Sequence, residues 1–273
     1  MKKTILITGS STGIGRATVV YFQEKGWNVV ATMRTPEKET ELNQLENVLV
    51  TRLDVQNLDS IDSAVNASIE RFGKIDVLLN NAGYGLMGTF ESMSRESIQR
   101  QYDVNVFGLF DVTRAVLPHM RENGDGIIIN VSSVGGKITF PLISLYHSTK
   151  WAVEGYSESL QYELAPLGIK VKIVEPGAIA TDFGSRSLDF QHDESLTQYN
   201  ELVGKIMQAF EGMTDPTKSS PSSLVAEVIY QASTDGSDQL RYIAGADAEQ
   251  YIAARKSMDD KAFFDMMKEN LSL

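Results

Sequence analysis

The stretch Thr8-Gly9-Ser10-Ser11-Thr12-Gly13-Ile14-Gly15 connects a short apolar run at residues 4–8 to a segment of helical period at residues 14–25. Glycine allows a tight turn there, because it has no Cβ and tolerates positive φ. The first N–H groups of the following helix then face whatever sits on the turn, and the helix end favours negative charge. This glycine loop therefore predicts a dinucleotide site rather than a plain structural turn. The expected contacts in the loop are Gly9, Ser11, Thr12, Gly13, Ile14 and Gly15.

The same residues also satisfy Gly-x-Ser-x-Gly, the turn that carries the nucleophile of α/β hydrolases. A hydrolase needs an oxyanion-hole loop upstream of that turn, and only eight residues precede Gly9. We therefore disfavour a hydrolase.

Apolar runs alternate with segments of helical period along most of the chain. The runs lie at residues 4–8, 28–33, 48–53, 75–80, 126–131 and 170–175, and the helical segments at residues 14–25, 58–72, 95–121 and 146–167. Such alternation predicts an α/β protein with a single doubly wound parallel sheet, the Rossmann fold.

The regular pattern ends after Pro176-Gly177, and we expect a variable substrate-binding loop with helices over residues 182–223. Its last part, residues 215–223, is rich in Ser and Pro and is expected to be a linker or mobile loop. Residues 224–273 are expected to supply a strand at 240–244 and one closing helix at 249–269. The prediction is one domain over residues 1–273, with the cofactor-binding and catalytic core at 1–181.

The composition excludes several classes of protein. The chain has 273 residues, 25 basic against 36 acidic side chains and no cysteine. The absence of cysteine excludes disulfides and thiolate catalysis, and three scattered histidines leave little for a metal site. A net charge of −11 opposes binding to nucleic acid or anionic membranes. No apolar stretch is long enough to span a bilayer, so we expect a cytoplasmic protein with no metal.

The end of the second apolar run indicates which dinucleotide binds. An NAD-binding unit usually carries an acid there, which holds the adenosine ribose, but this run ends Ala31-Thr32-Met33-Arg34. A guanidinium at position 34 can bind the 2′-phosphate of NADP through charge-assisted hydrogen bonds. We predict NADP(H), with NAD(H) left open and a merely solvated Arg34 as the alternative.

Polar side chains cluster where other runs end. Asn80-Asn81-Ala82-Gly83 closes one run, and Ser133 follows another. Tyr146 and Lys150 are four residues apart at the start of a helical segment, which places them on one face. The carboxyl ends of parallel strands are where open α/β sheets bind ligands. We therefore expect these residues to meet at one edge of the sheet.

Together these motifs resemble the short-chain dehydrogenase/reductase family. The family's glycine motif corresponds to residues 8–15, its adenine-contacting acid to Asp54, and its Pro-Gly turn with Thr to residues 176–181. The resemblance runs from about residue 3 to 181 by motif and to about 247 by architecture. Within the family the sequence looks like the hydroxysteroid and retinol dehydrogenases and the bacterial carbonyl reductases.

The resemblance implies a catalytic tetrad of Asn105, Ser133, Tyr146 and Lys150. Hydride transfer to a carbonyl carbon leaves negative charge on the oxygen, which needs a proton donor. Tyr146 would be that donor, and the charge of Lys150 would lower the pKa of the phenol. Ser133 would hold the substrate oxygen, and Asn105 would anchor a water that connects Lys150 to solvent.

The resemblance also implies a set of further cofactor contacts. They are Arg34, Asp54, Val55, Asn81, Ala82, Gly83, Pro176, Gly177, Ile179 and Thr181, together with Tyr146 and Lys150.

The segment between Ser133 and Tyr146, with Leu86 and Met87, predicts an apolar pocket for a hydrophobic ketone, aldehyde or alcohol. A non-catalytic dinucleotide sensor on the same fold is the alternative, although a sensor has no reason to keep the whole tetrad. The resemblance further implies a homodimer or homotetramer formed through the helices at residues 95–121 and 146–167.

Overall fold

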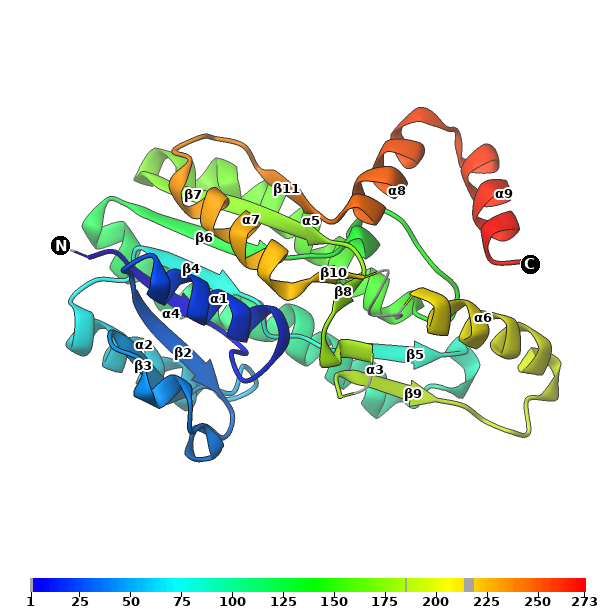
Figure 1. The fold of residues 1–273 in the computed structure, drawn as a ribbon, viewed down its shortest axis with the longest axis horizontal. Helices are drawn as coiled ribbons and strands as arrows, with labels where there is room; N and C mark the ends of the chain where they lie inside the picture. Colours follow the sequence, from blue (N-terminus) through cyan, green and yellow to red (C-terminus); the bar gives the residue numbers. More distant parts are fainter. Residues whose placement is uncertain (1, 185, 214–218) are drawn as a thin grey trace.

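A seven-stranded parallel sheet forms the centre of the molecule in this computed structural model, which describes residues 2–184, 186–213 and 219–273 (Figure 1). The strand order is β11-β7-β6-β4-β1-β2-β3. The strands are β1 (Thr4–Ile7), β2 (Asn28–Met33), β3 (Val48–Arg52), β4 (Val77–Asn80), β6 (Gly126–Val131), β7 (Ile169–Pro176) and β11 (Arg241–Ala244).

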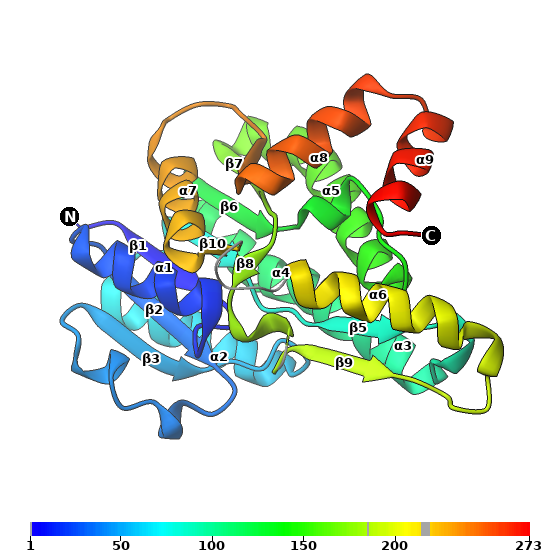
Figure 2. The ribbon, with the colours of Figure 1, turned by 45° about the vertical axis from the view of Figure 1, so that its right-hand side comes forward.

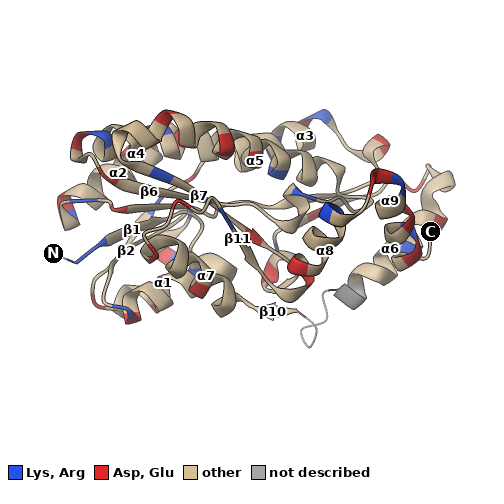
Figure 3. Ribbon diagram, turned by 90° about the horizontal axis from the view of Figure 1, so that it is seen from above, with Lys and Arg blue, Asp and Glu red and all other residues tan. Residues whose placement is uncertain are grey.

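Helices cover both faces of this sheet (Figure 3). On one face lie α1 (Gly13–Glu24) and α7 (Ser222–Thr234). On the other face lie α2 (Leu58–Phe72), α4 (Gly108–Asn123) and α5 (Ser144–Leu164). The doubly wound parallel sheet predicted from the sequence is therefore confirmed.

Side chains of the central strands alternate between the two cores. In β1, Ile5 and Ile7 pack with α1 and α7, whereas Leu6 packs on the opposite face. Because successive side chains of a strand point to opposite faces, a strand covered on both sides carries apolar residues on both faces. All four residues of β1 are accordingly buried.

The sheet reverses its strand order at β1. This strand pairs with β2 on one side and with β4 on the other. The loops that leave the carboxyl ends of β1 and β4 therefore run in opposite directions and leave a crevice between them, where ligands of open α/β sheets bind. The predicted glycine loop follows β1, and Asn81 follows β4.

The segment predicted as helical over residues 95–121 is helical throughout, but it is not a uniform α-helix. The segment forms α3 (Arg95–Tyr102), a π-helical turn at Asp103–Phe107 and then α4. A π-turn adds one residue to the helical repeat, so the hydrophobic period shifts across it. Asn105 lies within this turn and is only 3% exposed.

The prediction of one closing helix over residues 249–269 is wrong, because the chain forms α8 (Ala246–Ser257) and α9 (Asp260–Asn270). Met258 is extended, and the Asp259 side chain accepts a hydrogen bond from the Ala262 N–H at 2.8 Å. An N-cap of this kind starts a new helix.

Sequence analysis missed several elements beyond β4. Strand β5 (Gly85–Gly88) pairs in parallel with β9 (Leu188–Gln191), and β8 (Ile179–Ala180) pairs with β10 (Ser220–Pro221). Helix α6 (Asn200–Met213) lies alongside β5 (Figure 2), within the region where helices were expected, whereas α7 was not predicted. The expected linker at 215–223 is wrong for 220–223, which form β10 and the start of α7, while 215–218 lie outside the described residues.

The described part of the chain contains no helix with the length and apolar character needed to cross a bilayer. The division of the chain at residues 182 and 224 stays a prediction.

Candidate active site

The glycine loop after β1 adopts backbone conformations that side chains disfavour. Gly9 has φ +72° and Gly13 has φ +58°, both in the left-handed region. A Cβ at Gly9 would lie 3.0 Å from the Ala82 Cα, and one at Gly15 would collide with the Gly9 carbonyl oxygen. The loop can thus fold back on itself and on the chain after β4 only because these positions are glycine.

Asn81 holds this loop from the other side of the crevice. Its Nδ2 donates to the carbonyl oxygens of Thr8, at 2.9 Å, and Gly9, at 3.0 Å. The Thr8 hydroxyl accepts from the N–H groups of Asn81 and Ala82 at 2.9 and 3.0 Å. These bonds connect the carboxyl ends of β1 and β4, so the side chain of Asn81 braces the loop.

The start of α1 fits a dinucleotide diphosphate. Thr12 occupies the N-cap position but makes no side-chain hydrogen bond to the first turn, and that turn contains no acidic residue. The first N–H groups of a helix have no partner within the helix, so those of α1 remain open toward the crevice. An anion seated there would satisfy them.

Arg34 stands at the end of β2, where the adenosine ribose of a bound dinucleotide is expected. It is exposed and makes no ion pair among the described residues. Arg16, by contrast, is already paired with Glu39 at 2.7 Å and with Glu41. Of these two basic side chains, Arg34 is the one available for a 2′-phosphate.

The two other predicted cofactor segments follow β3 and β7. Asp54 is half-buried after β3, where its Oδ1 accepts from the Gln56 N–H at 3.1 Å, and Val55 is buried beside it. The chain after β7 brings the Thr181 side chain to within 3.5 Å of where a Gly13 Cβ would stand. Thr181 therefore lies beside the glycine loop, although the two are far apart in the sequence.

Pro176 and Gly177 make the turn that leads the chain there. The Gly177 N–H donates to the Ala244 carbonyl at 2.9 Å, and the Asp247 carboxylate accepts from the Ala178 N–H at 2.7 Å. Ile179 follows in β8.

Tyr146 and Lys150 share one face of α5, as their spacing predicts. The Lys150 Nζ lies 5.6 Å from the centroid of the Tyr146 ring and donates to the Val131 carbonyl oxygen at 2.8 Å. Ser133 hydrogen-bonds to the Tyr146 phenol and also accepts from the Gly135 N–H at 3.0 Å. The structure thus brings Ser133, Tyr146 and Lys150 together at the carboxyl edge of the sheet.

Burial governs the protonation of both groups. Burial raises the pKa of Tyr146 to about 12, and the hydrogen bond from Ser133 opposes this only in part. Burial also lowers the pKa of Lys150 to about 8, against the charge of Glu154. The net shift of the phenol pKa is therefore upward, opposite in direction to the effect expected from Lys150.

Asn105 braces the chain after β4. Its Oδ1 accepts from the Tyr84 N–H at 3.0 Å, and its Nδ2 donates to the Tyr84 carbonyl at 2.8 Å and to the Thr149 hydroxyl at 3.2 Å. A Cβ at Gly83 would lie 3.2 Å from the Asn105 Oδ1. Asn105 therefore joins the π-turn, the Gly83-Tyr84 turn and α5.

An apolar wall adjoins the phenol. Met87 of β5, Leu142 before α5 and Ile206 of α6 are buried in one cluster, against which Tyr146 packs. Leu86 belongs to a separate cluster. The Phe183 ring lies 5.7 Å from the Tyr146 ring, and sequence reasoning missed this contact.

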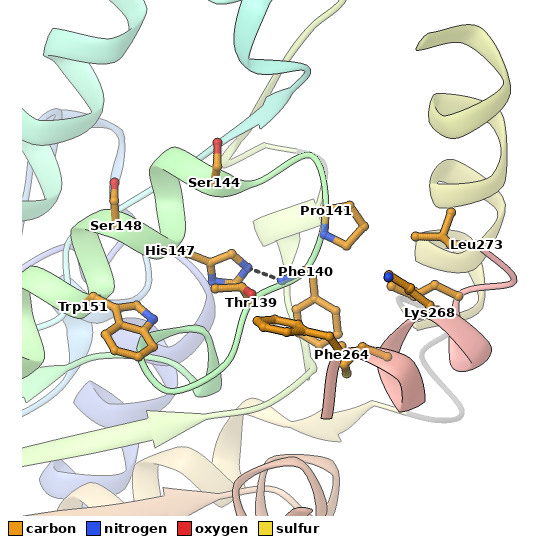
Figure 4. A pocket seen from close by; sticks show the side chains of 12 residues that line it. Thr139, Phe140, Pro141, Ser144, His147, Ser148, Trp151, Phe264, Lys268 and Leu273 are labelled. Atoms are coloured by element: carbon orange, nitrogen blue, oxygen red, sulfur yellow. Dashed lines mark hydrogen bonds between the residues drawn. The ribbon is translucent and has the colours of Figure 1, made fainter. Parts of the chain in front are cut away.

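His147 is a second residue that sequence reasoning missed. Its Nδ1 pairs with the Gly135 carbonyl at 2.8 Å, and its Nε2 accepts from the Phe140 N–H at 2.8 Å (Figure 4). The imidazole thus joins two points of the segment between Ser133 and Tyr146. Burial lowers its pKa to about 4. In the sequence, only its position one residue after Tyr146 could have indicated that His147 lies near the site.

Such a glycine loop, with a Ser–Tyr–Lys group at the same sheet edge, defines a class of dinucleotide-linked oxidoreductases. The family model for short chain dehydrogenase matches residues 3–191. The chain belongs to the short-chain dehydrogenase/reductase family.

Two curated relatives are similar over most of the chain. An oxidoreductase of Schizosaccharomyces pombe is 44% identical over 88% of this chain and 100% of its own length. A 3-ketodihydrosphingosine reductase of Bacteroides thetaiotaomicron is 40% identical over 72% of this chain and 70% of its own.

Solved structures agree with this placement. A short-chain dehydrogenase from Streptomyces avermitilis has a TM-score of 0.84 at 34% identity, covering 99% of this chain and 97% of that one. The NADP-bound structure of ElxO has a TM-score of 0.73 at 28% identity, covering 89% of this chain and 98% of that one.

The buried imidazole predicts a specific loss of stability in acid. The unfolded chain takes up a proton on this residue near its ordinary pKa of 6.5, whereas the folded protein does so only near 4. The contribution of neutral His147 is therefore full above about pH 6.5 and is lost as the pH falls toward 4, by up to about 3 kcal/mol. We expect the free energy of unfolding of the wild type, measured by urea denaturation, to approach that of His147→Gln over this range.

The comparison of the two proteins isolates the histidine, because the other titrating groups are common to both. Parallel curves of unfolding free energy against pH would contradict the role given to His147.

Proposed function

We propose that the protein is an NADPH-dependent reductase that converts a hydrophobic ketone or aldehyde to the alcohol. The observation that carries this proposal is the meeting of Ser133, Tyr146 and Lys150 beside an apolar wall at the carboxyl edge of the sheet. Bound NADPH would supply the hydride. The uncapped start of α1 supports its binding, and so does Arg34, which forms no ion pair within the described part of the chain. The NADP found in ElxO agrees with this.

The state of the phenol favours the reductive direction. With its pKa near 12, Tyr146 holds its proton throughout the neutral range. A carbonyl oxygen that gains negative charge in the transition state can take this proton, which is general acid catalysis. Ser133 would bind the same oxygen and orient it, because its hydroxyl already lies next to the phenol.

Lys150 would stabilise the phenolate that remains after proton transfer. Its Nζ faces the ring and is held by Val131, so the ammonium is in place before charge develops. With a pKa near 8, Lys150 can also exchange a proton close to neutral pH. Asn105 would contribute by positioning the Tyr84 turn and α5. It would also anchor a water that connects Lys150 to solvent.

Two features support an apolar substrate. The wall formed by Met87, Leu142 and Ile206 offers no charge next to the phenol, and Phe183 adds an aromatic face. The Bacteroides relative is named as a 3-ketodihydrosphingosine reductase, which is a reductase of a ketone. A dinucleotide sensor remains the second candidate, favoured only by the shared fold, and the cytoplasmic location and homo-oligomeric state stay predictions.

Replacement of the proton donor tests the mechanism. We expect Tyr146→Phe to lower kcat for NADPH-dependent ketone reduction by at least about 100-fold, because a general acid is typically worth that much. NADPH binding, measured by fluorescence titration, should stay within about threefold of the wild type.

Tyr102→Phe is the matched control. The Tyr102 hydroxyl bonds to Ser148 at 2.8 Å, outside the Ser133–Tyr146 contact, so this variant should keep its turnover. Retention of more than about a tenth of the wild-type rate in Tyr146→Phe would refute the donor role.

The substrate class is tested with a panel of 2-alkanones of increasing chain length, with aldose sugars as polar competitors. We expect kcat/KM to rise with chain length, by up to about fourfold per buried methylene. A preference for sugars would refute the apolar pocket. Absence of NADPH consumption with every carbonyl compound would favour the sensor.

The cofactor preference is tested at Arg34. We expect Arg34→Ala to raise KM for NADPH by about 10-fold or more, because a charge-assisted phosphate contact is lost, and to leave KM for NADH within about twofold. Arg71→Ala, at the far end of α2 where Arg71 lies on the Phe72 ring, is the control. Equal effects on both cofactors would refute the phosphate contact.

A further inference from the structure

A group of charged side chains is buried one helical turn beyond Lys150. Glu154 of α5 is 4% exposed and Glu175 of β7 is 2% exposed. The Glu154 Oε2 pairs with the Lys137 Nζ at 3.1 Å and with the Arg241 Nε at 3.0 Å. The same Arg241 Nε lies 3.5 Å from the Glu175 Oε1. Two buried carboxyl groups from different elements therefore share one guanidinium.

The two buried carboxyl groups differ in how closely cations compensate them. Glu154 pairs directly with Lys137 and Arg241, whereas Glu175 has only the longer contact with Arg241 at 3.5 Å. The second side of Arg241 is taken by the exposed Glu158, whose Oε2 lies 2.5 Å from the Arg241 Nη2. A buried carboxylate without close compensation is costly and normally takes up a proton.

Three buried polar atoms in this region also have no hydrogen-bond partner among the described residues. They are the Glu154 Oε1, the Glu175 Oε1 and the Ser132 Oγ. The two carboxyl groups are within hydrogen-bonding reach of each other, and two carboxylates can bond only if one of them carries a proton. One proton on Glu175 removes the less compensated of the two buried charges and supplies the missing donor.

Glu154 connects this carboxyl pair to the reacting groups. It follows Lys150 by four residues on α5, so the two side chains are on the same helix face. The charge of Glu154 acts on Lys150 by raising its pKa against the effect of burial. The other charged groups that face the pair are Lys137, Glu158 and Arg241, and the Asp247 carboxylate next to Gly177 is held by the Ala178 N–H.

We propose that Glu154 and Glu175 are positioning residues for the reaction, a carboxyl pair that holds one proton and keeps the ammonium of Lys150 charged. Protonated Glu175 donates to Glu154, which stabilises Glu154 as the ionised partner in a buried place. Ionised Glu154 in turn stabilises the positive charge one turn away. The role of the pair in the reaction rests on the proposed function. The shared proton and its effect on the pKa of Lys150 do not depend on whether the protein turns over a substrate.

The protonation of the pair agrees with its surroundings. Burial and the adjacent Glu154 raise the pKa of Glu175 to about 7, against Lys137 and Arg241. Glu175 thus stays protonated below about pH 7 and loses the proton above it. Lys137 and Arg241 are each 29% exposed, so the group borders solvent and the proton can exchange.

The first experiment detects the proton by infrared difference spectroscopy of the full-length protein between pH 5 and 9. We expect the carbonyl stretch of a protonated carboxyl group at pH 6 that disappears through about pH 7. This band should be absent from Glu154→Gln and Glu175→Gln. It should persist in Glu158→Gln, the matched control, which removes an exposed carboxylate from the same Arg241. A band unaffected by Glu175→Gln, or no such band, would overturn the shared proton.

The second experiment follows Lys150 by side-chain nitrogen NMR of lysine-labelled protein, with its signal assigned by its loss in Lys150→Met. We expect Glu154→Gln to lower the pKa of Lys150 by about one unit, because a nearby negative charge is removed. Glu175→Gln can still donate a hydrogen bond to Glu154, so it should retain the wild-type titration of Lys150. If Lys150 titrates in Glu154→Gln as it does in the wild type, the proposal that Glu154 keeps the Lys150 ammonium charged is overturned.

The pH profile of kcat then connects the pair to catalysis. The part of the kcat profile that follows the titration of Lys150 should move to lower pH by about one unit in Glu154→Gln. It should stay at the wild-type pH in Glu158→Gln. If the wild type reduces no carbonyl compound, the proposed function fails. The infrared and NMR titrations still decide whether the carboxyl pair holds a proton and acts on Lys150.

Discussion

A buried ammonium group bonded to a strand end determines how the site is built. The Lys150 Nζ is almost fully enclosed and donates to the Val131 carbonyl, the last residue of β6. Desolvation of a charged amine is costly, so the helix that carries it must sit where a compensating oxygen is available. This bond places the start of α5 against the carboxyl end of β6. Tyr146 lies in the first turns of α5 and Ser133 follows β6 by two residues, so this placement brings the two side chains together.

The same desolvation explains the titration of the neighbouring groups. The interior disfavours the charged form of every group, so it raises the pKa of Tyr146 and Glu175 and lowers that of Lys150 and His147. A reductase benefits from this, because it needs a phenol that keeps its proton until the carbonyl oxygen becomes negative. The ammonium needs a carboxylate nearby to remain charged, and Glu154 is the group in position to supply it.

Local sequence patterns predicted the central sheet well and its surroundings poorly. Most of the strands that read as apolar runs are buried on both faces, so composition alone marked them, while the edge strand β3 is only half-buried. Helix α7 also has an apolar spacing, with Val225, Ile229 and Ala232 buried, but the preceding Ser- and Pro-rich stretch concealed its start. The parallel pairing of β5 with β9 could not be predicted, because their partners are about 100 residues apart.

The sequence by itself determined the topology, the family and the order of the polar residues along the chain. It did so because short stretches of sequence are enough to recognise the glycines at the turn after β1 and the polar side chains at strand ends. Neither pattern requires knowledge of distant contacts. Only the tertiary structure decided the state of those residues. It enclosed Lys150, bonded Asn81 to the glycine loop and brought Glu154 beside Glu175. Solvation and pairing of a charge depend on all elements packed around it, and those elements come from every part of the chain.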